Sequence, residues 1–155
     1  MNCEELSFCE STATPDQIHA HLCESEGTFV PPLGLRVVLR DYATKIAENA
    51  VTFEAWAGGA LVGLVAAYLN DPVRRVAFVS NVSVVPSFAG RGIAAALMRR
   101  CERRSVRDGF ACMELEVART NERAVRLYRR FGFIESGGQG EHMHMTKIMP
   151  TQSNQ

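Results

Sequence analysis

The stretch VSVVPSFAGRGIAAAL, residues 82–97, decides the fold. It opens with β-branched valines, and Pro86 ends a sheet ladder because it has no backbone N–H to donate. Gly90 and Gly92 let the backbone approach a ligand closely, and residues 93–97 are good helix formers. The stretch therefore predicts a buried strand, a glycine loop and a helix. A helix start carries N–H groups at its positive end and is a candidate anion site; the alternative is a tight connection with glycines for packing alone.

Length and composition favour one soluble domain. A chain of 155 residues with 46% hydrophobic residues can bury a sizeable core, and residues 1–149 are expected to form it, with a disordered tail over 150–155. No apolar run has transmembrane length, and the acidic first ten residues do not fit a signal peptide. Five cysteines without CxxC spacing predict neither disulfides nor a zinc site, so a cytoplasmic protein is expected.

The formal net charge of zero conceals an uneven distribution. Residues 90–130 contain eleven arginines against five acids. A basic block that begins at a candidate anion loop indicates a phosphate-bearing ligand, whereas the neutral chain as a whole does not favour nucleic acid. Most of these arginines, taken singly, are better explained as the solvated faces of helices.

Alternation, periodicity and turn residues predict an α/β order of elements around the central stretch. Before it, we expect a strand over 4–12, a helix capped by Thr14, a loop over 27–34, a helix over 35–49, a hairpin of strands 51–56 and 60–69, and a strand over 76–85. After it, we expect a helix over 92–108, a strand over 111–118, a helix over 121–131, and strands over 133–136 and 142–149.

Two carboxylates and a tyrosine follow the glycine loop. Glu114 and Glu116 are two residues apart in an expected strand, so they share a face. Tyr128 lies on the apolar side of an expected helix, where an aromatic residue is more often part of the core. His142 and His144 share a face of the last strand, but a metal pair there lacks a third ligand, and no metal is expected.

Four motifs over residues 80–135 carry a family resemblance when taken together: V-x-V-x-P, G-x-G-I-A, L-E-V-x-x-x-N and N-x-x-A-x-x-L-Y-x-x-x-G-F. With them the chain resembles the GNAT superfamily of acyl-CoA-dependent N-acetyltransferases. The resemblance implies an α/β (α+β) fold with a mixed, mostly antiparallel sheet of about seven strands and about four helices. It also implies that the sheet splays between its fourth and fifth strands and that acetyl-CoA lies in the gap.

The resemblance further implies which residues contact acetyl-CoA. Backbone groups of the fourth strand would meet the acetyl and pantetheine groups, the loop and helix start would cradle the pyrophosphate, and the N-cap of the later helix would hold the pantetheine arm. These cofactor-binding residues are Val82, Ser83, Val84, Gly90, Arg91, Gly92, Ile93, Ala94, Ala95 and Asn121. The family's loop usually begins with Gln or Arg, where this chain has Ala89; Arg91 is the candidate to compensate.

The chemistry needs a neutral amine and a proton for the departing thiolate. By resemblance, Tyr128 would supply that proton as general acid. Glu116 occupies the position of the base in ribosomal-protein N-terminal acetyltransferases, and Glu114 or a water is the alternative base. Because no Cys/His nucleophile arrangement is visible in the sequence, direct transfer to an amine is favoured over a covalent intermediate.

Two other functions compete with an enzyme that acetylates a primary amine on a small molecule or a protein N-terminus. One is a GNAT-like domain that binds acyl-CoA as a sensor without turnover. The other is a Rossmann-type dinucleotide site, because residues 90–95 fit G-x-G-x-x-A, although too little chain follows for the remaining parallel strands. Expected partners are acetyl-CoA and an amine acceptor, without nucleic acid or membrane, in a monomer or homodimer.

Overall fold

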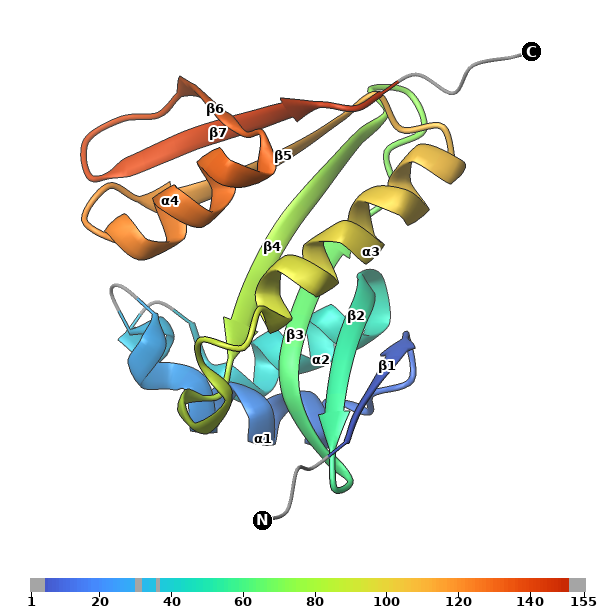
Figure 1. Cartoon of the computed structure of the whole chain (residues 1–155), viewed down its shortest axis with the longest axis vertical. Coiled ribbons are helices and arrows are strands. Elements are labelled where there is room, and N and C mark those ends of the chain that lie inside the picture. Colours follow the sequence, from blue (N-terminus) through green and yellow to red (C-terminus); the bar gives the residue numbers. More distant parts are fainter. Residues whose placement is uncertain (1–4, 30–31, 36, 151–155) are drawn as a thin grey trace.

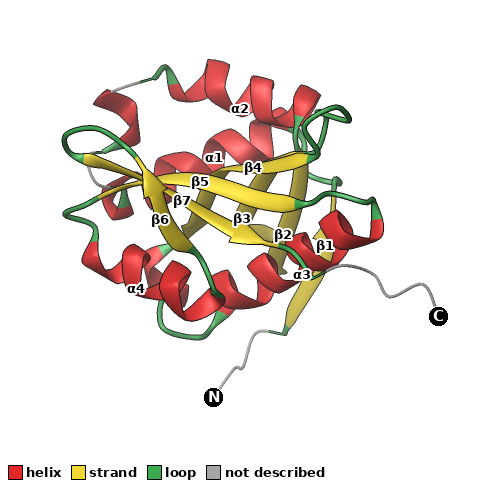
Figure 2. Cartoon of the chain, turned by 90° about the horizontal axis from the view of Figure 1, so that it is seen from above, coloured by secondary structure: helices red, strands yellow, loops and turns green. Residues whose placement is uncertain are grey.

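The computed structural model describes residues 5–29, 32–35 and 37–150. Within them, seven strands form one sheet in the order β1-β2-β3-β4-β5-β7-β6, with helices on both faces (Figures 1 and 2). The strands are β1 Leu6–Glu10, β2 Val51–Ala57, β3 Ala60–Tyr68, β4 Val76–Val84, β5 Cys112–Ala118, β6 Ile134–Gly137 and β7 His142–Ile148. The α-helices are α1 Pro15–Ser25, α2 Leu39–Asn49, α3 Ile93–Arg107 and α4 Glu122–Phe131, and 3-10 turns cover Glu26–Thr28, Leu33–Leu35 and Pro86–Phe88.

The sheet divides between β4 and β5. All the other neighbouring strands are antiparallel, but these two are parallel and pair only over Val76–Phe78 with Cys112–Glu114. Beyond Phe78 the two strands part, as Figure 1 shows. The expected mixed sheet of seven strands, splayed between the fourth and fifth, is therefore confirmed.

Two cores lie on the two faces of the sheet. On one face, α1 and α2 cover the first half of the sheet, with Ile18, Leu22 and Ile46 fully buried against β3. On the other face, α3 and α4 cover the core that contains Leu97 and Tyr128 (Figure 2). The half of the sheet formed by β5, β7 and β6 thus has a helix on one face only.

Local signals explain most of the element boundaries. Thr14 caps α1 with a full capping box, in which its side chain accepts from the Gln17 amide and the Gln17 side chain accepts from the Thr14 amide. Gly58 and Gly59 both have positive φ at the β2–β3 turn, as a tight hairpin requires.

The second helix starts later than the sequence predicts. It begins at Leu39 rather than 35, because residues 33–35 form a 3-10 turn and Val38 is extended, with φ −78° and ψ 115°. Val38 is 65% exposed and does not belong to the buried side of this helix, which contains Ala43 and Ile46. The predicted 27–34 loop contains residues 30 and 31, and the predicted tail contains residues 151–155; these positions lie outside the described residues.

A buried carboxylate anchors the start of the chain to the sheet. Glu54 of β2 is 0% exposed and accepts hydrogen bonds from the Thr12 and Ala13 amides, the Thr12 and Thr52 hydroxyls and the Trp56 indole. Burial alone would raise the pKa of Glu54, but these donors favour the carboxylate and the net effect lowers it. The Glu54 carboxylate therefore fixes the β1–α1 connection to β2 through the hydrogen bonds that it accepts.

Candidate active site

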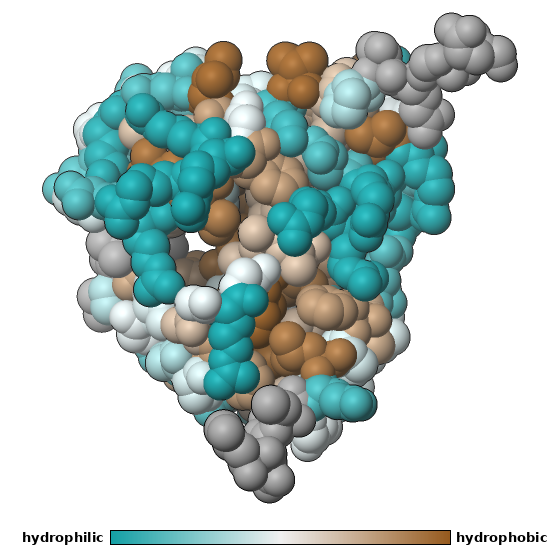
Figure 3. Space-filling model, viewed as in Figure 1, coloured by the Kyte–Doolittle hydropathy of each residue, from teal (hydrophilic) through white to brown (hydrophobic). Residues whose placement is uncertain are grey.

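A cavity of about 410 Å³ opens where β4 and β5 part. Figure 3 shows the surface hollowed beneath the hydrophilic exterior of α4, with hydrophobic residues inside. The end of β4, the glycine loop, the first turn of α3 and the inner side of α4 contribute most of its lining. The lining residues are Thr28, Val82, Ser83, Val84, Phe88, Ala89, Gly90, Gly92, Ile93, Ala94, Ala95, Asn121, Arg123, Ala124, Leu127, Tyr128 and Arg130.

The glycine loop offers backbone to this cavity. Gly90 has φ +79°, and Gly92, the N-cap of α3, has φ +75°. Residues other than glycine rarely adopt this backbone conformation. A Cβ at either position would meet no described atom within 4 Å, so the space beside the loop is open. The first amides of α3 have no carbonyl partner within the helix, so this end can bind an anion.

Arg91 takes a different place from the other predicted cofactor contacts. Its guanidinium lies 4.5 Å from the centre of the Phe88 ring and donates to the Ser87 carbonyl, and it is not among the residues that line the cavity. Two arginines of α4 that the sequence analysis did not single out, Arg123 and Arg130, line the cavity instead. Arg123 and Arg130 are seven residues apart, which is about two turns of a helix, and this spacing could have indicated that they share a face of α4.

Tyr128 lies in the core with one side on the cavity. It is 8% exposed and packs edge-to-face with Phe133, with ring centres 5.9 Å apart. Its hydroxyl has no hydrogen-bond partner among the described residues. Burial raises the pKa of Tyr128, so the hydroxyl keeps its proton through the physiological range.

Asn121 caps α4 and also lines the cavity. Its side-chain oxygen accepts from the Ala124 amide at 3.3 Å, which satisfies one of the open donors of the helix start. The two interpretations of Asn121, as a cap and as a ligand contact, are therefore compatible, because the cap uses the oxygen and leaves the side-chain N–H groups for a ligand.

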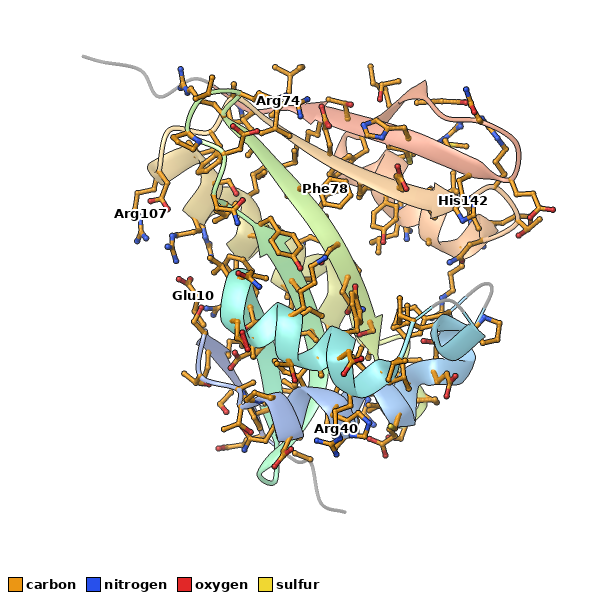
Figure 4. The ribbon with its side chains drawn as sticks, turned by 180° about the vertical axis from the view of Figure 1, so that it is seen from behind. Glu10, Arg40, Arg74, Phe78, Arg107 and His142 are labelled. Carbon is orange, nitrogen blue, oxygen red and sulfur yellow. The ribbon has the colours of Figure 1, made fainter. Side chains whose placement is uncertain are left out.

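The two carboxylates of β5 lie on the opposite face from Tyr128. Met113, Leu115 and Val117 point into the core that contains Tyr128, so the alternating Glu114 and Glu116 point the other way. Figure 4 views this second face, which no helix covers over β5 and β7 and from which His142 projects. The Glu116 side chain is 62% exposed and that of Glu114 is 20% exposed.

A second cavity, of about 460 Å³, lies on this open face. It is lined by Glu116, Ser136, Gly137, Gly138, Gln139, His142, Met143 and His144. His144 Nε2 is 3.2 Å from Glu114 Oε1, and His144 Nδ1 is 3.9 Å from Glu116 Oε1. Among the described residues, no group of three or more His, Cys, Asp and Glu side chains is arranged to hold a metal ion.

A buried histidine supports the wall of the first cavity. His21 of α1, 2% exposed, contacts the Leu61 carbonyl through Nδ1 at 2.9 Å and the Ser83 hydroxyl through Nε2 at 2.8 Å. Because a carbonyl only accepts, Nδ1 carries the proton of the neutral ring. The Ser83 hydroxyl lies between two acceptors for its single proton, His21 Nε2 and, at 2.9 Å, Asn81 Oδ1. Burial lowers the pKa of His21 to about 4, with the Leu61 hydrogen bond opposing that shift.

Comparison with known proteins agrees with this geometry. The model of the acetyltransferase (GNAT) family matches residues 16–133. The chain belongs to the GNAT acetyltransferase family. None of the helices in the part of the chain that the structure describes is long and apolar enough to cross a bilayer.

A curated relative and two solved structures illustrate the similarity. An uncharacterised N-acetyltransferase of Methanocaldococcus jannaschii is 36% identical over 66 residues, which is 43% of this chain and only 29% of that protein. The PaiA N-acetyltransferase of Thermoplasma acidophilum, solved with coenzyme A, has a TM-score of 0.74 at 15% identity, covering 92% of this chain and 99% of its own. The ribosomal-protein-S18-alanine N-acetyltransferase of Escherichia coli has a TM-score of 0.75 at 21% identity, covering 97% and 99%. These two structures share the fold.

Proposed function

We propose that the protein transfers the acetyl group of acetyl-CoA to a primary amine, on a small molecule or a protein N-terminus, by direct attack of the amine on the thioester. The observation that carries this proposal is the cavity between β4 and β5, which is lined by the start of α3, whose free amides can bind an anion, and by Tyr128 of α4. An elongated ligand with a pyrophosphate at one end and a reactive thioester at the other fits that combination.

The cofactor would be held largely by backbone. The amides at the start of α3 would bind the pyrophosphate, with Arg123 and Arg130 adding positive charge. Beyond Phe78 the edge of β4 has no partner strand, so its N–H and C=O groups are available to the amides of the pantetheine arm. An N–H of residues 82–84 would polarise the thioester carbonyl and stabilise the oxyanion that forms there.

Tyr128 would act as the general acid. When the amine attacks the carbonyl carbon, the C–S bond breaks and the sulfur leaves as a thiolate that needs a proton. A buried hydroxyl that is protonated at neutral pH and has no other partner among the described residues is suited to donate it. The support for this role is the combination of burial with a place on the cavity wall.

Glu116 would act as the general base from the other face. It takes a proton from the incoming ammonium group so that the nitrogen lone pair is free to attack. Its exposed carboxylate on the open face lets an acceptor approach from the side away from Tyr128, which separates the base from the acid. Glu114, which is more buried and is in contact with His144, is the alternative base, directly or through a water.

The first test is a screen of amines and of peptides with free N-termini, with acetyl-CoA as donor. Released thiol and the mass of the product would both be measured, and thermal melting with CoA or NAD would report binding. We expect transfer to at least one amine and stabilisation by CoA, roughly 2.7 kcal/mol at a hundredfold excess over the dissociation constant. Stabilisation by NAD and none by CoA overturns the proposal, and binding without turnover across the panel favours the sensor.

Replacing Gly92 tests the loop itself. Gly92→Val puts a branched side chain at φ +75° and into the open space beside the loop, so affinity for CoA should fall at least tenfold in a folded variant. Gly27→Ala is the matched control, because a Cβ there meets no described atom within 4 Å and Gly27 has no positive φ. Unchanged affinity for CoA in Gly92→Val would mean that the loop is only a turn.

A further inference from the structure

His144 lies between the two carboxylates of the open face. The strands β5 and β7 pair so that His144 is directly opposite Glu116, while Glu114 is opposite Thr146. Directly opposite side chains on one face of an antiparallel pair are in contact range, and diagonal neighbours are within reach of a long side chain. The imidazole therefore contacts both acids, at 3.2 Å from Glu114 and 3.9 Å from Glu116.

The two contacts fix the orientation of the His144 ring and indicate which of its nitrogens carries the proton. A carboxylate only accepts, so Nε2 of His144 carries the proton that it shares with Glu114 Oε1. In the neutral ring, Nδ1 then has a lone pair, and it points to the Glu116 carboxylate from a distance that one water or a small rotation of the glutamate closes. The ring is held by one glutamate and turned toward the other.

The surroundings contain little else that is charged. On its own strand, His142 shares this face and lines the same cavity. From β6, Ser136 donates to the His144 carbonyl and contacts the Thr146 hydroxyl, while the acid of that strand, Glu135, pairs with Arg119. From β5, only Glu114 and Glu116 face the ring.

We propose that His144 is a positioning and proton-relay residue that takes from Glu116 the proton released by the amine. The proposal rests on the proposed function and deepens it. A proton moves from the ammonium nitrogen to the Glu116 carboxylate, and from there to His144 Nδ1. The resulting imidazolium is held between two carboxylates until it loses a proton to solvent. The amine, now neutral, attacks the thioester carbon, the C–S bond breaks, and the thiolate takes its proton from Tyr128. The nitrogen loses its second proton as the amide forms, and that proton, passed through solvent, restores the Tyr128 hydroxyl.

This relay answers a difficulty of an exposed carboxylate base. A carboxylate in water is a weak proton acceptor near neutral pH, whereas imidazole accepts and releases protons in that range. Glu116 alone would return the proton to the amine more readily than it would pass it on. When His144 accepts the proton from Glu116, the proton leaves the reaction site, and the negative charge of Glu114 stabilises the imidazolium.

The test is the pH dependence of kcat/KM on an amine that the wild type accepts. His144→Gln should lower turnover roughly tenfold to a hundredfold at pH 7 and move the acid limb of the profile to higher pH, with activity recovering where the amine is already neutral. The KM for acetyl-CoA should stay unchanged, because none of the described residues that line the cavity of the open face lines the cavity between β4 and β5. His19→Gln, the same chemical change on α1, is the matched control and should keep the wild-type profile.

Glu114→Gln provides a second variant. It should give the same direction of shift, and the double variant should be no worse than His144→Gln alone, since both act through one ring. Independently of turnover, the NMR chemical shifts of the His144 ring should change in Glu114→Gln, because the group that accepts its Nε2 proton is no longer charged. An active wild type whose profile superimposes on that of His144→Gln overturns the relay alone. A wild type that acetylates no amine overturns the proposed function and the relay together.

Discussion

Tyr128 combines two roles at the residue scale. Its ring belongs to the core between α4 and β5, while its hydroxyl has no partner among the described residues and lines the cavity. Packing explains the ring, whereas no contact in the described part of the chain explains the hydroxyl. Its place at the cavity is consistent with a use in catalysis.

Tyr128→Phe separates the two roles. It keeps the ring and its contact with Phe133 and removes only the hydroxyl. If that hydroxyl protonates the thiolate, turnover should fall about a hundredfold or more while affinity for acetyl-CoA and thermal stability change little. Single-turnover kinetics and melting of both proteins would measure this. Turnover close to wild type would remove Tyr128 from the mechanism.

His21 makes stability depend on pH. Burial lowers the pKa of His21 to about 4 from an ordinary value of 6.5, so the unfolded chain binds this proton more readily than the folded one. The stability that the neutral ring contributes is complete above pH 6.5 and is lost as the pH falls to about 4, by about 3 kcal/mol in total.

Urea unfolding at pH 7.5 and pH 4.5 checks this contribution. His21→Gln should be less stable than wild type at pH 7.5, and the difference should shrink at pH 4.5, because the variant has no imidazole to protonate. Carboxylates such as Glu54 titrate in both proteins and cancel in the comparison. His19→Gln should follow wild type at both values. A gap between wild type and His21→Gln that stays constant would contradict the assignment.

Contacts between residues that are far apart in the chain could not be predicted from the sequence. The family resemblance, carried by short motifs, implied that Gly90, Gly92, Asn121 and Tyr128 belong to one site, and all four line one cavity. The contact of His21 with Ser83 joins residues 62 positions apart, and no local pattern announces it. The approach of His144 to Glu116 depends in the same way on the register of β5 and β7, which is a property of the folded sheet.

At the scale of elements, α3 is positioned by a glycine in the neighbouring strand. Gly63 of β3 lies directly under the first turn of α3, and a Cβ built on it would be 2.6 Å from Ile93 Cγ2. Contacts that close do not occur in folded proteins, so the helix start and the strand approach each other only because position 63 has no side chain. The start of α3, which follows the glycine loop, therefore packs closely on β3.

Gly63→Ala should therefore disturb the anion site from below. We expect a loss of about 1–3 kcal/mol in stability from overpacking, with weaker CoA binding as the start of α3 moves. Ile93→Ala removes the clashing atom, so the double variant should be more stable than the sum of the two single losses implies. Denaturant unfolding and CoA titration of the three variants would measure this. Strictly additive losses would show that the two residues are not in conflict.

The elements themselves were predicted well where turns and caps are local. The hairpin at Gly58–Gly59, the capped start of α1 and the order of later elements follow from neighbouring residues. The start of α2 was wrong by four residues, because a helix-compatible sequence at 35–38 gives way to a 3-10 turn and an extended Val38. Propensity alone cannot decide between these conformations.

At the scale of the whole molecule, the sheet has two halves with a narrow connection. Three residue pairs join β4 to β5, and α3 adds a second link through Glu102 Oε2, 2.5 Å from Lys147 Nζ of β7, which also lies over the Phe131 ring. The remaining backbone groups along the two facing edges have no strand partner. A ligand in the gap would supply partners to both.

Hydrogen exchange should reveal that dependence. Without ligand, amides of β4 beyond Phe78 that point into the gap should exchange faster than those of β3, which is paired on both sides. Saturating CoA should slow them specifically, together with amides at the start of α3. Exchange measured by NMR with and without CoA would show it, and protection spread evenly over the chain would contradict it.

The unpaired edges also have a consequence for the life of the protein in a cell. If a small molecule completes the sheet, then the fraction of chains that open far enough for a protease to cut falls as that molecule becomes abundant. The steady-state amount of the protein would then follow the supply of its own donor: plentiful cofactor would preserve the catalyst, and scarcity would hasten its removal. A gap between two strands would thereby link the abundance of an enzyme to the metabolic state around it.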